Sequence, residues 1–258
     1  MRVLILGGTT EARALAAELA LDERFSPIYS LAGRTAAPLL AGTRTRIGGF
    51  GGAEGLAAWL RHEAIDVVID ATHPYAARIS VNAVTAAREC GLPLLRLHRP
   101  PWQRERDDDW RDVANAEAAC AALGTERRRV FLGIGRNELA VFKHAPQHRY
   151  VVRAVDAPNP VDLPPLADVI LQRGPFTLVD ELSLMRERAI EVVVSKNSGG
   201  AAAQAKIVAA RQLGIQVVMI ARPDQPDANE CTDAEAALRW LDGLVDTAHG
   251  RTTSARGV

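Results

Sequence analysis

The chain has 258 residues, of which 48% are hydrophobic and 24% charged, and its 31 basic and 31 acidic residues give a formal net charge of zero. This length suffices for one large domain or two small ones, and the neutral balance gives no sequence-wide reason to expect nucleic acid or an anionic membrane as partner. No apolar run approaches the roughly 20 residues of a membrane helix, and the start of the chain lacks a signal-peptide pattern, so we expect a cytoplasmic protein.

In the first half, short β-branched runs alternate with alanine-rich segments of helical periodicity, the pattern of parallel strands joined by crossover helices. Strands are predicted near residues 2–6, 27–31, 43–47, 67–70 and 94–97, and helices at 11–21, 54–63 and 76–90. Residues 99–112 are dense in charge and proline, and we expect a connecting loop or an extended strand there.

A second alternating series follows, with strands near 130–133, 150–155, 169–171, 191–195 and 216–220 and helices at 115–123, 177–187, 201–213 and 233–241. The sequence therefore predicts an α/β protein with two Rossmann-like parallel-sheet domains and a cleft between them, although one continuous sheet is also possible. We expect the domains at residues 1–126 and 127–245, followed by a frayed polar tail at 246–258.

The first predicted strand runs directly into Gly7-Gly8-Thr9-Thr10-Glu11-Ala12 and a helix. A glycine-rich turn at a helix N-terminus collects backbone N–H groups and the positive end of the helix dipole, which suits a phosphate. Gly8, Thr9, Thr10 and Glu11 are therefore candidate nucleotide-binding residues. The G-x-G-x-x-G spacing is absent, and a plain tight turn with Thr9 or Thr10 as N-cap remains the alternative.

The second predicted strand ends in Gly33-Arg34-Thr35, where dinucleotide-binding folds often place an acid that holds the ribose 2′-hydroxyl. An arginine there favours a 2′-phosphate and hence NADP(H) over NAD(H), unless Arg34 is an ordinary solvated charge. After the third strand, residues 47–52 contain four glycines, so the backbone there either approaches a ligand closely or forms a flexible surface loop.

The fourth predicted strand leads into Thr72-His73-Pro74-Tyr75, at the carboxyl end where open α/β sheets bind ligands. Thr72, His73 and Tyr75 could bind cofactor or substrate, and His73 or Tyr75 could supply a proton. The alternative is structural, with a capping Thr72 or Asp70 and with His73 bonded to a backbone carbonyl.

In the second half, a buried-type strand ends in Ser195-Lys196-Asn197-Ser198-Gly199-Gly200 before a helix, which predicts a second anion-binding turn. Lys196 is one of only three lysines, with Lys143 and Lys206, and a purely structural turn does not explain it. The segment Gly133-Ile134-Gly135-Arg136-Asn137 and the segment at Arg173 are further glycine turns that carry a charge, each equally compatible with a plain turn.

The sequence lacks G-x-S-x-G and H-E-x-x-H motifs and carboxylates at metal-ligand spacing, and we predict no metal ligand. Cys90, Cys120 and Cys231 have no Cys-x-x-Cys partner, and we interpret them as free structural thiols.

Taken together, Gly-Gly-Thr-Thr-Glu-Ala at residues 7–12, Asp-Ala-Thr-His-Pro-Tyr-Ala at 70–76 and Ser-Lys-Asn-Ser-Gly-Gly at 195–200 resemble the precorrin-6A reductase family of cobalamin biosynthesis. Residues 133–137 are similar to that family's pattern as well, and the resemblance runs over nearly the whole chain. It implies an NADPH-dependent oxidoreductase that reduces one carbon–carbon double bond of the precorrin-6A macrocycle to give precorrin-6B. The family has a metal-free branch and a cobalt branch, which these residues do not separate.

Under this resemblance, the cofactor-binding residues would be Gly8, Thr9, Thr10, Glu11, Gly33, Arg34, Thr35, Thr72 and His73. The macrocycle is a polyanion that a neutral protein must hold with a few placed cations. The substrate-binding residues would be Arg136, Asn137, Arg173, Ser195, Lys196, Asn197, Ser198 and Gly199, and Lys196, His73 or Tyr75 would assist protonation. The expected partners are the tetrapyrrole substrate and, transiently, neighbouring pathway enzymes.

Two alternatives from other classes stay open at this point. One is a dinucleotide-binding regulatory module without catalysis, and the other is a twin-Rossmann transferase with a nucleotide-activated donor. Stabilisation by UDP compounds but not by NADPH would favour the transferase.

Overall fold

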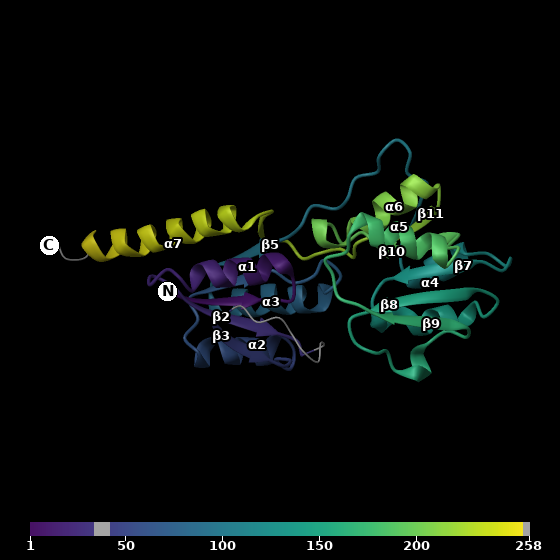
Figure 1. Cartoon of the computed structure of the whole chain (residues 1–258). Coiled ribbons are helices and arrows are strands. Elements are labelled where there is room, and N and C mark those ends of the chain that lie inside the picture. The colour runs from purple at the N-terminus through teal and green to yellow at the C-terminus, as the bar shows by residue number, and fades with distance from the viewer. Residues whose placement is uncertain (34–41, 255–258) are drawn as a thin grey trace. The chain divides into compact units, whose positions relative to one another are not determined.

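The computed structural model describes residues 1–33 and 42–254, with side chains as far as residue 247. Two parallel sheets form within it, and contacts divide the chain into one unit of Met1–Arg99 with Pro223–Val258 and a second of Pro100–Arg222. The predicted class of two parallel-sheet α/β domains is confirmed, and the single continuous sheet is excluded (Figure 1).

The first sheet has the order β12-β5-β4-β1-β2-β3. Its strands are β1 (Arg2–Leu6), β2 (Ser26–Leu31), β3 (Arg44–Ile47), β4 (Val67–Asp70), β5 (Leu94–Leu97) and β12 (Asn229–Cys231). Its helices are α1 (Thr10–Leu19), α2 (Gly52–His62), α3 (Ala77–Cys90) and α7 (Ala234–Ser254). Alternate residues of the strands face opposite ways, so that α1 and α7 cover one face and α2 and α3 the other.

The second sheet has the order β6-β11-β10-β7-β8-β9. Its strands are β6 (Trp110–Val113), β7 (Arg129–Gly133), β8 (Arg149–Ala154), β9 (Ala167–Leu171), β10 (Val192–Lys196) and β11 (Gln216–Ile220). The unit also contains the helices α4 (Ala116–Ala122), α5 (Leu178–Glu187) and α6 (Ala205–Leu213), with the 3₁₀ segments η1 (Arg136–His144), η2 (Pro160–Asp162) and η3 (Ala201–Ala203). Helices α5 and α6 pack on one face of this sheet.

Contacts divide the chain at other places than the predicted boundary between residues 126 and 127. β6 follows the first five strands in sequence but pairs with β11 of the second sheet, and β12 follows β11 but pairs with β5 of the first. Each sheet thus takes its sixth strand from the other end of the sequence, because a short strand can complete an edge wherever backbone groups are unpaired. The predicted tail from residue 246 continues α7 as far as Ser254.

Both sheets reverse their winding direction between two central strands, β1 and β4 in the first and β7 and β10 in the second. Ligands of open α/β sheets bind outside the carboxyl ends of strands at such a switch point. Leu6 lies opposite Asp70 and Gly133 lies opposite Ser195, so the loops that follow these residues are neighbours at each switch point. All the predicted catalytic loops are therefore at the two edges where this topology binds ligands.

Candidate active site

The turn between β1 and α1 has the geometry of a phosphate-binding turn. Gly8 has a φ of +115°, and a Cβ atom there would have no neighbour within 4 Å, so the backbone is open to a ligand. The N–H groups of the first turn of α1 have no acceptor within the helix. Thr10, the first residue of α1, is exposed. The geometry supports the predicted role of this turn.

Thr9 shows that the structural alternative also holds. Its Oγ1 accepts a hydrogen bond from the backbone N–H of Ala12 at 3.1 Å, which makes it the N-cap of α1, and donates to the Ala71 carbonyl at 2.9 Å. The second bond ties the turn after β1 to the loop after β4. Thr9 therefore joins the two loops of the switch point, and its side chain is already engaged in both bonds.

Tyr29 of β2 closes the floor of this turn, which sequence reasoning missed. The Gly8 N–H donates to the Tyr29 hydroxyl at 3.2 Å, and a Cβ atom on Gly7 would lie 2.1 Å from the Tyr29 ring. Burial raises the pKa of Tyr29, which keeps the hydroxyl protonated at neutral pH. A phenol in a buried strand needs a polar partner, which is the sequence signal that could have identified Tyr29.

Glu11 has a partner that lies far away in the sequence. Its Oε2 is 3.8 Å from a guanidinium nitrogen of Arg99, and the Arg99 side chain is only 14% exposed. Burial lowers the pKa of Arg99, and the Glu11 charge opposes that shift. Arg99 adds a cation beside the predicted phosphate turn that no local pattern indicated.

Two other predicted cofactor residues cannot be placed: Arg34 and Thr35 lie outside the described residues. Gly33, just before them, is exposed with a φ of +71°. In the glycine-rich loop after β3, the Arg46 guanidinium donates to the carbonyls of Gly48 and Gly49, each at 2.6 Å, and lies 3.7 Å from the Phe50 ring centroid. These bonds hold part of the loop, contrary to the flexible alternative.

The loop after β4 is held by its own polar groups. Asp70, only 1% exposed, accepts hydrogen bonds on Oδ1 from the Thr72 N–H at 3.2 Å and from the Thr72 hydroxyl at 2.7 Å. His73 Nδ1 accepts from the Tyr75 N–H at 3.3 Å, and the two rings lie 5.7 Å apart. The loop thus brings Thr72, His73 and Tyr75 together beside the turn after β1. The structural alternative differs in detail, because Ala76 is the N-cap of α3 and His73 bonds to an N–H group and not to a carbonyl.

In the second unit, the two loops at the switch point meet through an ion pair. Lys196 ends β10, and its Nζ lies 2.8 Å from Oε1 of Glu138 in η1. The Lys196 side chain is 13% exposed, and Glu138 Oε2 is buried without a hydrogen bond. Glu138 was not predicted, because nothing local to residues 133–138 indicates a contact with β10.

The other residues of the Lys196 turn are largely structural in their contacts. The Asn197 side chain exchanges two hydrogen bonds with the Trp102 backbone, at 2.8 and 3.1 Å. Ser195 is fully buried, and its hydroxyl donates to the Lys196 carbonyl at 3.1 Å. A Cβ atom on Gly199, at a φ of +65°, would lie 2.1 Å from the Pro100 carbonyl oxygen. Ser198, 8% exposed, donates its N–H to the Lys196 carbonyl at 2.8 Å.

The remaining predicted substrate residues are on the surface. Arg136 and Asn137 are exposed at the start of η1, directly after the glycine turn that follows β7. Arg173 is exposed in the loop that joins β9 to α5. The structure therefore brings Arg136 and Asn137 near the Lys196 loop through the Lys196–Glu138 pair.

The described residues form neither a metal-binding cluster nor a membrane-spanning helix. Within the described part of the chain, no three histidine, cysteine, aspartate or glutamate side chains are grouped to hold a metal ion. No helix among residues 1–33 and 42–254 is both long enough and apolar enough to cross a membrane.

Comparisons with known proteins agree with one another. The model of the family described as precorrin-6x reductase CbiJ/CobK matches residues 2–242. The chain is 52% identical over 244 residues to precorrin-6A reductase of Sinorhizobium sp, covering 93% of this chain and 94% of that one. It is 29% identical to cobalt-precorrin-6A reductase of Salmonella typhimurium, covering 93% and 96%.

A solved structure, CobK precorrin-6A reductase, superimposes with a TM-score of 0.90 at 46% identity, covering 94% of this chain and 96% of that chain. The family-model match over residues 2–242 includes every strand of both sheets and the loops that carry the predicted residues. The chain therefore belongs to the precorrin-6x reductase family.

Proposed function

We propose that the protein reduces one carbon–carbon double bond of metal-free precorrin-6A with NADPH, giving precorrin-6B in cobalamin biosynthesis, in the cytoplasm. The choice of the metal-free substrate rests on the sequence identities to the relatives of the two branches. Four relatives named precorrin-6A reductase from different organisms are 45–52% identical, whereas three named cobalt-precorrin-6A reductase are 28–29% identical, over similar shares of the chain. The regulatory and transferase alternatives gain no support from these relatives.

NADPH fits the first unit. The open backbone at Gly8, the first-turn N–H groups of α1 and the nearby Arg99 suit the diphosphate, and Thr72 and His73 are beside them at the same switch point. Arg34 and Thr35, with Gly33, would hold the 2′-phosphate. When bound, NADPH supplies the hydride. The protein contributes to catalysis by positioning the reactants and by electrostatic stabilisation.

Lys196 is the proton donor that we favour, with Tyr75 and His73 as alternatives. Reduction places a hydride on one carbon of the double bond and a proton on its partner, and solvent restores the donor afterwards. Glu138 Oε1, 2.8 Å from Lys196 Nζ, holds the lysine side chain in place at the end of β10. Arg136, Arg173 and the 195–199 turn would hold the acetate and propionate groups of the substrate, with Asn137 beside them.

Gly8→Ala is expected to weaken NADPH binding by about tenfold, because a methyl group would keep a phosphate away from the turn. Gly91→Ala is the matched control, since Gly91 also has a positive φ, +67°, and open space around its Cβ position. Both variants should lose about 1–3 kcal/mol of stability from backbone strain. Titration of NADPH fluorescence checks this, and equal affinity losses in both variants would contradict the assignment.

Arg34→Ala is expected to raise the dissociation constant of NADPH by about 10- to 100-fold, because a charge-assisted hydrogen bond to the 2′-phosphate is lost. NADH lacks that phosphate, so its affinity should change by less than about twofold. Calorimetric titration with both cofactors measures the difference. Equal losses for both would remove the 2′-phosphate role.

The reaction itself is tested by an anaerobic single-turnover absorbance assay. The protein and NADPH are mixed separately with metal-free precorrin-6A and with its cobalt complex, with NADH as control. We expect the NADPH band to fall and the tetrapyrrole spectrum to shift only with the metal-free substrate. No change in either mixture, with NADPH shown to bind, would favour the regulatory module instead.

A further inference from the structure

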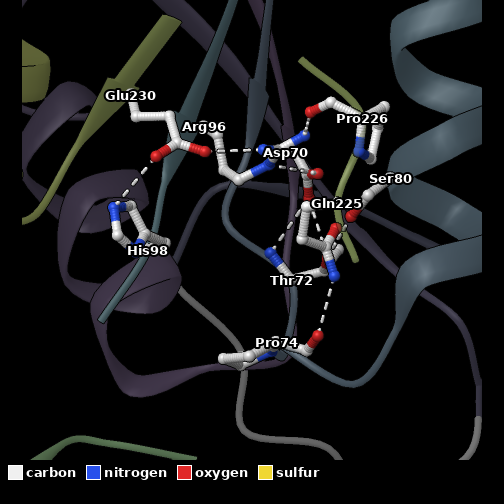
Figure 2. Close-up of polar contacts among 9 residues, drawn as sticks. All are labelled: Asp70, Thr72, Pro74, Ser80, Arg96, His98, Gln225, Pro226 and Glu230. Atoms are coloured by element: carbon white, nitrogen blue, oxygen red, sulfur yellow. Dashed lines mark hydrogen bonds and ion pairs between the residues drawn. The ribbon is translucent and has the colours of Figure 1, made fainter. Parts of the chain in front are cut away.

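A row of charged side chains crosses the edge of the first sheet. Asp70 lies opposite Arg96 in the pairing of β4 with β5, and Arg96 lies opposite Glu230 in the pairing of β5 with β12. Arg96 is 6% exposed. Its Nε lies 3.8 Å from Asp70 Oδ2, and its Nη1 lies 2.6 Å from Glu230 Oε1 (Figure 2). Its Nη2 donates a hydrogen bond to the Pro226 carbonyl at 2.7 Å. One buried arginine therefore joins β4 to the segment that precedes β12.

The acidic end of this row supports the loop after β4. The Asp70 carboxylate receives both bonds from Thr72 on Oδ1. Its Oδ2 is buried, has no hydrogen-bond partner among the described residues and lies 3.8 Å from Nε of Arg96. A buried carboxyl group without a polar or charged neighbour is costly, and Arg96 supplies such a neighbour to Asp70. The Thr72 hydroxyl also lies 3.4 Å from the Ser80 hydroxyl, at the start of α3.

The segment between Pro223 and β12 also contacts the Thr72–Tyr75 loop directly. Gln225 Nε2 donates to the Pro74 carbonyl at 2.8 Å, between His73 and Tyr75. The amide orientation follows from chemistry, since an oxygen placed there would face another acceptor. Gln225 Oε1 is buried without a hydrogen-bond partner in the described part of the chain, so the bond to Pro74 is the contact that we test.

We propose that Asp70, Arg96 and Gln225 are positioning residues that set the geometry of the Thr72–Tyr75 loop. The proposal rests on the proposed function, in which Thr72 and His73 bind the cofactor and His73 and Tyr75 are alternative proton donors. The loop is held on one side by Asp70 through Thr72 and on the other by Gln225 through Pro74, and Arg96 fixes both supports relative to each other. The segment from Pro223 to β12 thus completes the site as well as the sheet.

Gln225→Met tests the proposal, because it keeps the length of the side chain and removes the donor. The matched control is Gln147→Met, since Gln147 Nε2 donates to the Gly124 carbonyl at 2.9 Å in the second unit. Asp70→Asn is a second variant, which removes the charge that faces Arg96. Three quantities are measured: the single-turnover rate of hydride transfer, the dissociation constant of NADPH, and hydrogen exchange of residues 71–80 without ligand.

For Gln225→Met we expect hydride transfer to slow by about 10- to 100-fold, since a displacement of about 1 Å can cost that much. The NADPH dissociation constant should change by less than about threefold, because the diphosphate site is untouched, and exchange at 71–80 should accelerate. Gln147→Met should match the wild type in all three measurements. Unchanged exchange, or an unchanged rate in a variant of an active wild type, would overturn the positioning role alone, whereas an inactive wild type would overturn the proposed function and this role with it.

Discussion

Replacing Lys196 by Met is expected to slow single-turnover reduction of precorrin-6A by about 100- to 10,000-fold, the range that a positioned general acid contributes. Lys196 projects from the end of β10 at the switch point of the second sheet, with its ammonium group held by Glu138. Methionine keeps most of the side-chain volume and removes the proton. NADPH binding, placed in the other unit, should remain within about threefold of the wild-type value.

Lys143→Met is the control, because Lys143 is exposed and donates to the Val161 carbonyl away from both switch points. It should react like the wild type. If Lys196→Met weakens substrate binding but leaves the single-turnover rate unchanged, the lysine is a substrate-binding cation and water donates the proton. Equivalent variants of His73 and Tyr75 would then decide whether either of them takes part.

Glu181→Ala is expected to lower the free energy of unfolding by about 3–5 kcal/mol, because it leaves a buried arginine without its counter-charge. The Glu181 carboxylate in α5 is fully buried and lies 2.6 Å from Arg153 of β8, whose side chain is 7% exposed. The Arg153 guanidinium also lies 3.6 Å from the Phe176 ring centroid. This pair therefore secures the segment that follows Arg173, and substrate binding should weaken together with stability.

Urea denaturation measures this loss. The control Glu89→Ala removes an exposed ion pair with Arg61, 2.7 Å long, and should change the stability far less because solvent screens it. The double variant Arg153→Met with Glu181→Leu should recover much of the lost stability, since it leaves no charge buried. Equal losses for Glu181→Ala and Glu89→Ala would show that the buried pair is not a structural support.

Most strands and helices could be predicted because their signal is local. β4 and β5 have the predicted bounds, since each is a short apolar run with turn residues on both sides. β12 could not be predicted: its three residues are exposed or half-buried, with no alternation to detect. Its place in the first sheet depends on pairing with β5, and no local pattern shows that the chain returns to this sheet.

In the candidate site, too, the turns have a local sequence signal and their distant partners do not. The glycine turn at Gly8 and the turn at Lys196 could be located from the sequence, because a turn that leads into a helix is a local pattern. The partners of these turns could not, since Glu138 and Tyr29 reach them only through the packing of parallel strands. The role of Gln225 could not be predicted either, because its contact with Pro74 forms only when the chain after Pro223 returns to the first sheet.

The most direct test of the account is isotopic. The protein, metal-free precorrin-6A and NADPH carrying deuterium at both positions of nicotinamide carbon 4 are mixed without oxygen in ordinary water, and the reduced macrocycle is analysed by mass spectrometry. The account predicts that the product gains one deuterium from the cofactor and one hydrogen from solvent. A reduced product without deuterium, or NADPH oxidation without a reduced macrocycle, would contradict direct hydride transfer from NADPH to this substrate.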